Sequence, residues 1–448
     1  MPISDTGKNT QRRADAHDIF QAALQAADPR QCIFRSMRLD GDYLKVLDAT
    51  YALQQFSKIV VIGAGKATPA MAAAAEEILG DYITAGAINT KYDHGLPLKY
   101  ITTTECGHPL PDQAGVAGTK HLTSLLQDLD EDALVIALFS GGGSALLPAP
   151  AAGISLAEKQ ETTQMLLACG ASINEINTIR KHLSSTKGGL LARQSFPARI
   201  ISLMLSDVIG DPLDTIASGP THPDPTTFAD CLELVDHYQL GPKLPEAVSQ
   251  HLQDGLRGHL PETPKGDDPC FEKVQTHVIG NNALALAAAS QTAQDRGYRT
   301  LVLSSRIEGE TREVAAVHAA ITQEIRTTGQ PIAPPACLIS GGETTVTLRG
   351  KGKGGRNQEF VLSACLRLQG WEGITLLSGG TDGTDGPTNA AGALGDGTTV
   401  ERARELGLSA TSHLEQNDSY HFFKALDDLV ITGPTNTNVM DLQILLVS

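Results

Sequence analysis

The sequence predicts an α/β protein of two domains. Its 448 residues exceed what one hydrophobic core usually serves. Short apolar segments alternate with segments of helical periodicity, which is typical of βα units and a parallel sheet. Residues 255–269 (GLRGHLPETPKGDDP) interrupt this pattern with proline, glycine and charge. We therefore expect a disordered tail at 1–16, a first domain at 17–254, a linker at 255–269 and a second domain at 270–448.

The first half contains four segments so rich in isoleucine, valine, leucine and alanine that strands covered on both faces are expected. They are Lys58–Gly63, Ala85–Thr90, Ala133–Ser140 and Arg199–Asp207. A helix is predicted over Thr68–Leu79. Two later helices begin with capping boxes at Ser155 and Ser172, each with a glutamate three residues on.

The second half predicts a smaller sheet of mixed direction. Helices are expected at Ala283–Arg296 and Thr311–Ile325, and alternation in Thr344–Leu348 predicts an antiparallel strand. The remaining strands are expected at Thr276–Asn281, Arg299–Ser305, Ala336–Ser340, Ile374–Ser378, Leu429–Ile431 and Leu442–Val447.

Composition restricts the class of protein. The formal net charge of −16 argues against binding to nucleic acid or to an anionic membrane. The seven cysteines include no C-x-x-C pair, so reduced core thiols are expected rather than disulfides or a zinc site. No apolar run approaches the ~18 residues that span a bilayer, and no secretory signal is evident. We expect a cytoplasmic monomer or homodimer that acts on small molecules.

Glycine-rich turns follow several predicted strands, at the edge where open parallel sheets bind ligands. Such turns expose backbone N–H groups that can approach phosphate oxygens, although a single one can be no more than a tight connection. The residues expected here to bind a nucleotide are Gly63, Gly65, Ser140, Gly141, Gly142, Gly143 and Ser144.

Lys66 follows the first of these turns, where its ammonium could reach a phosphate; a solvated surface lysine is the alternative. The segment is not a Walker A loop, because Val60 stands where its first glycine belongs and Ala67 follows the lysine. Thr68 occupies the last position of a dinucleotide-binding fingerprint, so that motif is also incomplete.

The densest basic segment is RGKGKGGRNQE, residues 349–359. Its interleaved glycines exclude a regular helix, and the apolar helix that follows could bind an anion at its N-terminus. We expect Lys353, Gly354 and Gly355 to contact the nucleotide, and Arg356 to stabilise charge on a transferring phosphoryl group. A flexible solvated loop is the alternative.

Aspartates in two further turns are candidates for chemistry. Asp382 and Asp385 could hold Mg²⁺, although loop aspartates more often cap helices or close turns. Asp207 and Asp211 are likewise candidates for binding Mg²⁺, and one of them could act as a general base. Residues expected to contact substrate are His108, Asp207, Asn282 and Glu343, with His222 as a further candidate.

Taken in order, several motifs give the chain a strong resemblance to the glycerate 2-kinases of the MOFRL family. They are GAGKA, GHPLPD, SGGGSALL, LSDVIGDPLDTIASGPT, SGGETTVTLRGKGKGGRNQE, GGTDGTDGPT and LVITGPTNTNVMDL. The resemblance implies a Rossmann-like N-terminal domain, a MOFRL domain and a site between them. It also implies ATP, a divalent cation such as Mg²⁺, D-glycerate as acceptor, 2-phosphoglycerate as product, and Lys66 with Arg356 as the catalytic pair.

Two other functions remain as alternatives. Members of the family have been named hydroxypyruvate reductases, but the incomplete fingerprint argues against a nicotinamide cofactor. A non-catalytic sensor of phosphorylated metabolites would keep the glycine-rich turns without needing the Lys66–Arg356 pair.

Overall fold

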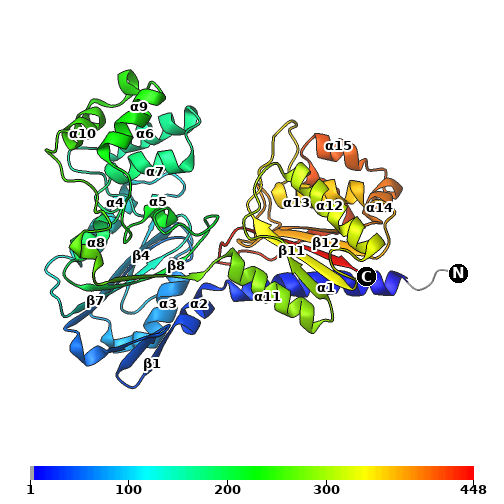
Figure 1. Cartoon of the computed structure of the whole chain (residues 1–448), viewed down its shortest axis with the longest axis horizontal. Helices are drawn as coiled ribbons and strands as arrows, with labels where there is room; N and C mark the ends of the chain where they lie inside the picture. The colour runs from blue at the N-terminus through cyan, green and yellow to red at the C-terminus, as the bar shows by residue number, and fades with distance from the viewer. Residues whose placement is uncertain (1–4) are drawn as a thin grey trace. The chain divides into compact units, whose positions relative to one another are not determined.

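A computed structural model describes residues 5–448, which form two compact units (Figure 1). The N-terminal unit is Pro29–Ile279. The C-terminal unit combines the chain up to Asp28 with Gly280–Ser448. No helix in the described range is both long and apolar enough to cross a membrane. All seven cysteines are free, as expected.

The N-terminal unit is built on a six-stranded sheet, ordered β6 (Thr102–Cys106), β5 (Ala85–Lys91), β4 (Lys58–Ala64), β7 (Ala133–Phe139), β8 (Arg199–Leu205) and β9 (Val274–Gly280). All neighbours from β6 to β8 pair in parallel. This confirms the expected parallel α/β architecture. The polar strand β6 was not predicted.

Helices flank this sheet and form a separate helical cluster near one end of it (Figure 1). They are α2 (Pro29–Ser36), α3 (Thr68–Leu79), α4 (Gln113–Ser124), α5 (Gly143–Leu146), α6 (Leu156–Ala168), α7 (Ile173–His182), α8 (Leu190–Ser195), α9 (Phe228–His237) and α10 (Glu246–Leu256). Both predicted capping boxes are present, at Ser155 and Ser172. A small antiparallel sheet, β1 (Met37–Asp40), β2 (Tyr43–Val46) and β3 (Ala49–Ala52), completes the unit.

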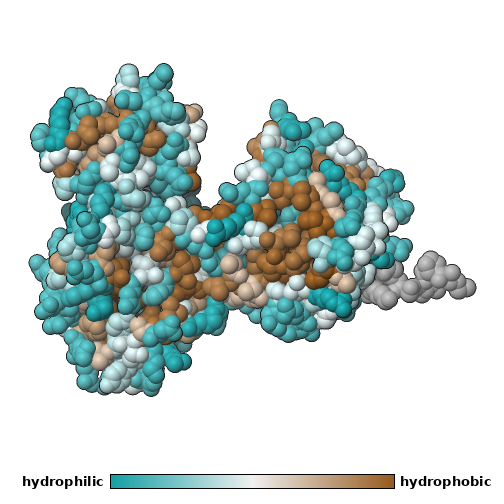
Figure 2. All heavy atoms as spheres, viewed as in Figure 1, coloured by the Kyte–Doolittle hydropathy of each residue, from teal (hydrophilic) through white to brown (hydrophobic). Residues whose placement is uncertain are grey.

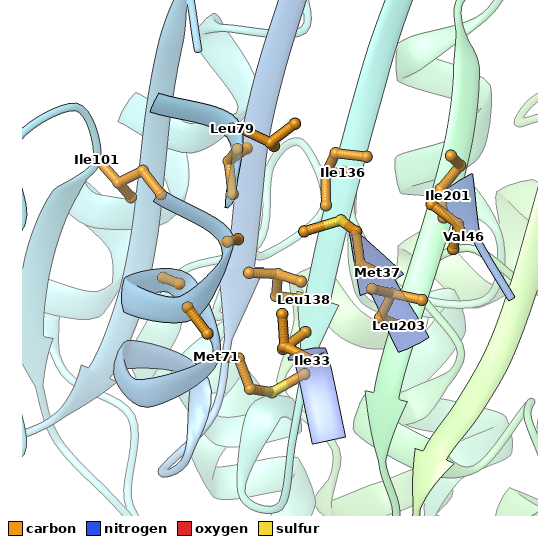
Figure 3. Packing of buried hydrophobic residues seen from close by; sticks show 14 of the residues in the cluster. Ile33, Met37, Val46, Met71, Leu79, Ile101, Ile136, Leu138, Ile201 and Leu203 are labelled. Carbon is orange, nitrogen blue, oxygen red and sulfur yellow. The ribbon is translucent and has the colours of Figure 1, made fainter. Parts of the chain in front are cut away.

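The core explains why the strands are apolar along their whole length. Figure 3 shows Ile136 and Leu138 of β7 beside Leu203 of β8, with Met71 of α3 and Ile33 of α2 packed over them. A second cluster covers the opposite face of the same sheet. Strands buried on both faces cannot alternate polar and apolar residues.

The C-terminal unit has a mixed sheet, ordered β10 (Arg299–Val302), β11 (Ala336–Gly342), β15 (Asp441–Val447), β12 (Ile374–Gly380), β13 (Gly392–Asp396) and β14 (Leu429–Val430). The last long strand, β15, lies antiparallel between β11 and β12. One face carries α1 (Asp5–Ala26) and α11 (Asn282–Asp295). The other carries α12 (Thr311–Thr328), α13 (Arg356–Arg367), α14 (Thr399–Glu405), α15 (Ala410–Glu415) and α16 (Ser419–Leu426).

The exposed surface agrees with this layered arrangement. On the face drawn in Figure 2, hydrophilic residues cover most of the helices, and hydrophobic residues are concentrated near the strands of both units.

The expected disordered tail at 1–16 is wrong for residues 5–16, which begin α1; residues 1–4 lie outside the described range. The helix belongs to the C-terminal unit because Ile19 and Phe20 are fully buried in its core. Its polar first half is held by long-range bonds, such as that from Arg12 Nη1 to Ser448 Oγ at 3.0 Å. Polarity in this segment therefore reflects partners elsewhere in the chain.

The domain boundary also differs from expectation. The segment expected as the first strand of the second domain, Thr276–Asn281, largely coincides with β9, which completes the N-terminal sheet. The expected linker 255–269 lies inside the N-terminal unit, where Thr263 Oγ1 donates to the buried Asp224 at 3.0 Å. Thr344–Leu348, all of it described, forms no strand, and Thr345 makes an isolated bridge with Glu310.

Candidate active site

Two glycine-rich turns interlock at the carboxyl ends of β4 and β7. Lys66 N donates to Gly141 O at 2.9 Å, and Ala67 N donates to Ser140 Oγ at 3.0 Å. Gly65 has a φ of +150°, and a side chain there would overlap Ser140. Glycine at this position therefore permits the close approach that places Lys66 beside the second turn.

Lys66, His108 and Asp207 meet around this pair of turns. A Cβ atom on Gly142 would lie 2.8 Å from His108 Nε2 and 3.5 Å from Lys66 Cγ, and one on Gly141 would overlap the Asp207 carboxylate. The structure thus brings Lys66, His108 and Asp207 together at the two glycine-rich turns.

The charges here are suited to an anionic ligand. In the described part of the chain, the half-buried Lys66 amine has no hydrogen-bond or ion-pair partner. Burial lowers the pKa of His108 to about 4, and the charges of Lys66 and Lys91 contribute. At neutral pH His108 is therefore an uncharged donor or acceptor, and Lys66 supplies the positive charge.

A hydroxyl pair that was not anticipated lies at the end of the second turn. Ser144 Oγ is 2.8 Å from Ser218 Oγ, and Ser218 Oγ donates to Asn177 Oδ1 at 3.2 Å. Ala217 and Ser218 have φ values of +50° and +63°, which non-glycine residues seldom adopt. Such strain often marks a functional loop, but it is invisible in the sequence.

In the C-terminal unit, Arg356 stands at the start of α13 between two carboxylates. Its Nε and Nη2 donate to Asp441 at 2.5 and 3.1 Å, and Nη1 donates to Glu343 Oε1 at 2.6 Å. Burial opposes the charge of Arg356, but Asp441 and Glu343 outweigh it and raise its pKa. The guanidinium is therefore fixed in position and permanently charged.

Asp441 is the residue of this site that sequence reasoning missed. It is fully buried at the start of β15 and also accepts from Asn357 Nδ2 at 2.9 Å. Burial raises its pKa to about 7, although Arg356 and Asn357 stabilise the carboxylate. Asn282 donates from Nδ2 to the main-chain oxygens of Val439 and Asp441, at 2.8 and 2.9 Å. Asn282 therefore stabilises the start of β15 and the segment that leads into it.

Asp385, expected to bind a metal, caps α13 instead. Its Oδ1 accepts from Asn357 N at 3.0 Å, and its Oδ2 accepts from Gln358 N and Nε2, both at 2.9 Å. These bonds occupy both oxygens of a fully buried carboxylate. Asp382 closes a turn by accepting from Thr384 through Oδ1 alone. Of the expected metal pair, only Asp382 keeps an oxygen for a cation.

The helix N-terminus expected to hold phosphate is therefore occupied by the protein's own carboxylate. The basic loop before it is packed rather than open: Lys353 N donates to Asp418 Oδ1 at 2.9 Å, and Lys353 Nζ lies 4.7 Å from the centre of the Tyr420 ring. Side chains on Gly354 or Gly355 would overlap Ser419 or Asp385. These glycines serve close packing.

Mg²⁺ commonly binds one or two protein carboxylates together with phosphate oxygens and water. No group of three or more histidine, cysteine, aspartate or glutamate side chains suited to a metal occurs among the described residues. Asp382 alone would suffice for an ion whose other ligands come from a nucleotide. Its position fits, because a side chain on Gly380 would come within 3.5 Å of both Asp382 and Asp441.

Comparison with known proteins gives a family match for each unit and relatives that cover both. Residues 15–253 match a family model described as a domain of unknown function, DUF4147, and residues 336–441 match the MOFRL family. Glycerate 2-kinase from Pyrococcus horikoshii is 42% identical over 95% of each chain. The crystal structure of glycerate kinase from Thermotoga maritima is 39% identical with a TM-score of 0.89, covering 98% of this chain and all of that one. A putative hydroxypyruvate reductase from Agrobacterium vitis is 45% identical over 87% of this chain and 99% of its own.

Proposed function

This chain belongs to the DUF4147/MOFRL family of glycerate kinases, and we propose that it transfers the γ-phosphoryl group of ATP to the 2-hydroxyl of D-glycerate. The products are then 2-phosphoglycerate and ADP. Lys66 and Arg356 are the residues that we propose to stabilise the negative charge that develops during phosphoryl transfer.

The observation that carries this proposal is the free amine of Lys66 at the interlocked turns. Turns after neighbouring parallel strands gather backbone N–H groups at one edge of a sheet, where a phosphate chain can lie. Because no described residue pairs with the Lys66 ammonium, it is available to the phosphate. The transition state of phosphoryl transfer spreads negative charge over three oxygens, so catalysis consists largely of positioning and charge stabilisation.

Arg356 supplies the second charge in this account. Its two carboxylate partners fix its orientation before substrate binds, which lowers the cost of reorganisation during the reaction. Asp207 or His108 is proposed to orient the acceptor hydroxyl near Lys66, with Asp207 the candidate to receive its proton. Asp382 would help to hold Mg²⁺, which when bound neutralises part of the phosphate charge.

An enolase-coupled assay tests the regiochemistry. Purified protein, D-glycerate, ATP and Mg²⁺ should give immediate enolase-dependent absorbance, because enolase converts 2-phosphoglycerate directly. A signal that requires added phosphoglycerate mutase would mean phosphorylation of the 3-hydroxyl. Omission of ATP is the control.

The name hydroxypyruvate reductase carried by some relatives is tested in parallel. Oxidation of NADH by hydroxypyruvate without any ATP-dependent turnover of glycerate would overturn the kinase assignment. We expect the reverse, because Thr68 is fully buried in place of the last glycine or alanine of the nicotinamide-binding turn.

A further inference from the structure

Three cations of the N-terminal unit, Lys159, Arg180 and Lys187, interact electrostatically, and none of them pairs with a carboxylate among the described residues. Lys187 is fully buried, and its Nζ donates to the main-chain oxygens of Ser144 at 2.7 Å and Leu147 at 3.3 Å. Lys159 is also buried and donates to Leu183 O at 2.9 Å. Arg180, on α7, has no hydrogen-bond or ion-pair partner within the described part of the chain.

Lys181, the residue next to Arg180, shows how this fold neutralises a buried cation with carboxylates. Lys181 is buried and pairs with Asp214 at 3.2 Å and Asp224 at 3.3 Å. Buried charges in proteins are normally neutralised in this way. Arg180 has no such partner among the described residues, and because it is only half-buried its guanidinium is accessible to a ligand from solution.

The electrostatics of the cluster agree with this geometry. Burial lowers the pKa of Arg180, with no opposing contribution from an acidic group. Burial also lowers the pKa values of Lys159 and Lys187, and the charge of Arg180 adds to both shifts. The three groups repel one another, and a bound anion would relieve the repulsion.

The cluster adjoins the glycine-rich turn that follows β7. Lys187 Nζ bonds to the main-chain oxygen of Ser144, the last residue of that turn. Asn177, one helical turn before Arg180 on α7, accepts from Ser218, which in turn bonds the Ser144 hydroxyl. Hydrogen bonds thus connect α7, the helix that carries Arg180, to the glycine-rich turn that ends at Ser144.

We infer that Arg180, beside the Ser144 turn that Lys187 holds in place, binds an oxyanion of a substrate. The shared chemistry is a carboxylate of the hydroxy acid or a phosphate of the nucleotide. Arginine can bind either through two parallel hydrogen bonds. Lys187 is buried and donates to the main-chain oxygens of Ser144 and Leu147, so its role is to hold the Ser144 turn in place. The inference deepens the proposed function and depends on it only for the identity of the ligand.

The test measures binding without turnover. Thermal unfolding of the full chain is followed with D-glycerate, ADP or inorganic phosphate, each added alone, for the wild type, Arg180→Met and Arg180→Lys. We expect at least one probe to raise the unfolding temperature of the wild type. Arg180→Met should weaken its binding by about tenfold or more, and Arg180→Lys should weaken it less. A response to glycerate alone identifies the carboxylate, and a response to phosphate and ADP identifies the nucleotide.

A second readout separates this role from a structural one. Without added anion, Arg180→Met should unfold at the same temperature as the wild type or higher, because it removes an uncompensated charge. The matched control is Arg193→Met in the same unit, which breaks an ion pair with Asp268 at 2.7 Å and should lower stability while leaving the anion response intact.

Three results would overturn the inference. The wild type could respond to none of the probes, or Arg180→Met could keep the wild-type response to anions. Arg180→Met could also be less stable than the wild type without anion. A wild type that binds anion through Arg180 but does not phosphorylate glycerate would instead contradict the proposed function alone.

Discussion

Arg356 and Asp441 form a two-pronged ion pair, with Nε to Oδ2 at 2.5 Å and Nη2 to Oδ1 at 3.1 Å. The two residues are 85 positions apart in sequence, at the start of α13 and the start of β15. This pair holds the guanidinium in place, so the proposed role of Arg356 depends on Asp441.

Replacing Asp441 by Asn should lower kcat by on the order of 10-fold or more while changing KM little, because Arg356 acts mainly in the transition state. The amide keeps the size of the carboxyl but loses its charge. Steady-state kinetics measure the effect, and circular dichroism checks the fold. Glu343→Gln, at the partly exposed second partner, is the control and should have a smaller effect. A normal kcat for Asp441→Asn would show that orientation of Arg356 by this pair is unimportant.

Replacing Arg356 itself by Lys should lower kcat by roughly 100-fold, since an ammonium cannot reproduce the fixed fork of a guanidinium. The matched control is Arg367→Lys, an exposed arginine in the last turn of the same helix. That control should retain wild-type turnover. Equal activities of the two variants would remove Arg356 from the mechanism.

Replacing Asp385 should change the stability of the protein, whereas replacing Asp382 should change its requirement for Mg²⁺. Asp385→Asn places an amide donor against the N–H groups of α13 and should cost on the order of 1–3 kcal/mol of unfolding free energy, with or without Mg²⁺. Urea unfolding measures this. Asp382→Asn should instead raise the Mg²⁺ concentration needed for half-maximal activity. The reverse pattern would restore Asp385 as the metal ligand.

Lys159 predicts a specific dependence of stability on pH. Burial, with help from Arg180, lowers its pKa from 10.5 to about 7. Between these values the unfolded state binds more protons than the folded state, so this group makes stability rise with pH. Lys159→Met removes that slope, and its stability relative to the wild type should be greatest at or below pH 7 and decline toward pH 10.

The expected decline is roughly 3 kcal/mol. Urea unfolding at several pH values checks it. The control is Lys120→Met, at an exposed position of α4, which should show no such trend. A constant difference between wild type and Lys159→Met across this range would mean that Lys159 is not desolvated.

Much of the fold could be predicted because parallel strands that are buried on both faces have continuous apolar sequences. The strands β4, β5, β7 and β8 all begin at their predicted residues. The polar strand β6 (TTTEC) lies at the edge of its sheet and lacks that signal. The helix α1 was missed because its first half is polar, and Arg12 and Arg13 each bond to a residue more than 350 positions away.

The site was predictable where local turns create it and unpredictable where distant residues complete it. The glycine-rich turns identified Lys66, and the basic loop identified Arg356. The cap on α13 comes from Asp385, 28 residues after Asn357, and no local pattern reveals such a cap. Arg180 was overlooked because the missing partner of a cation is a property of the folded state.

The central proposal is that Lys66 and Arg356 both stabilise the transition state of phosphoryl transfer, and a double-mutant cycle in kcat/KM tests it most directly. Lys66→Met and Arg356→Lys are measured singly and together against the wild type. If both charges stabilise the same transition state, the double variant should be far more active than the product of the single effects predicts, with a coupling of about 2 kcal/mol or more. Additivity within about 0.5 kcal/mol would mean that the two residues act independently, and would contradict the account.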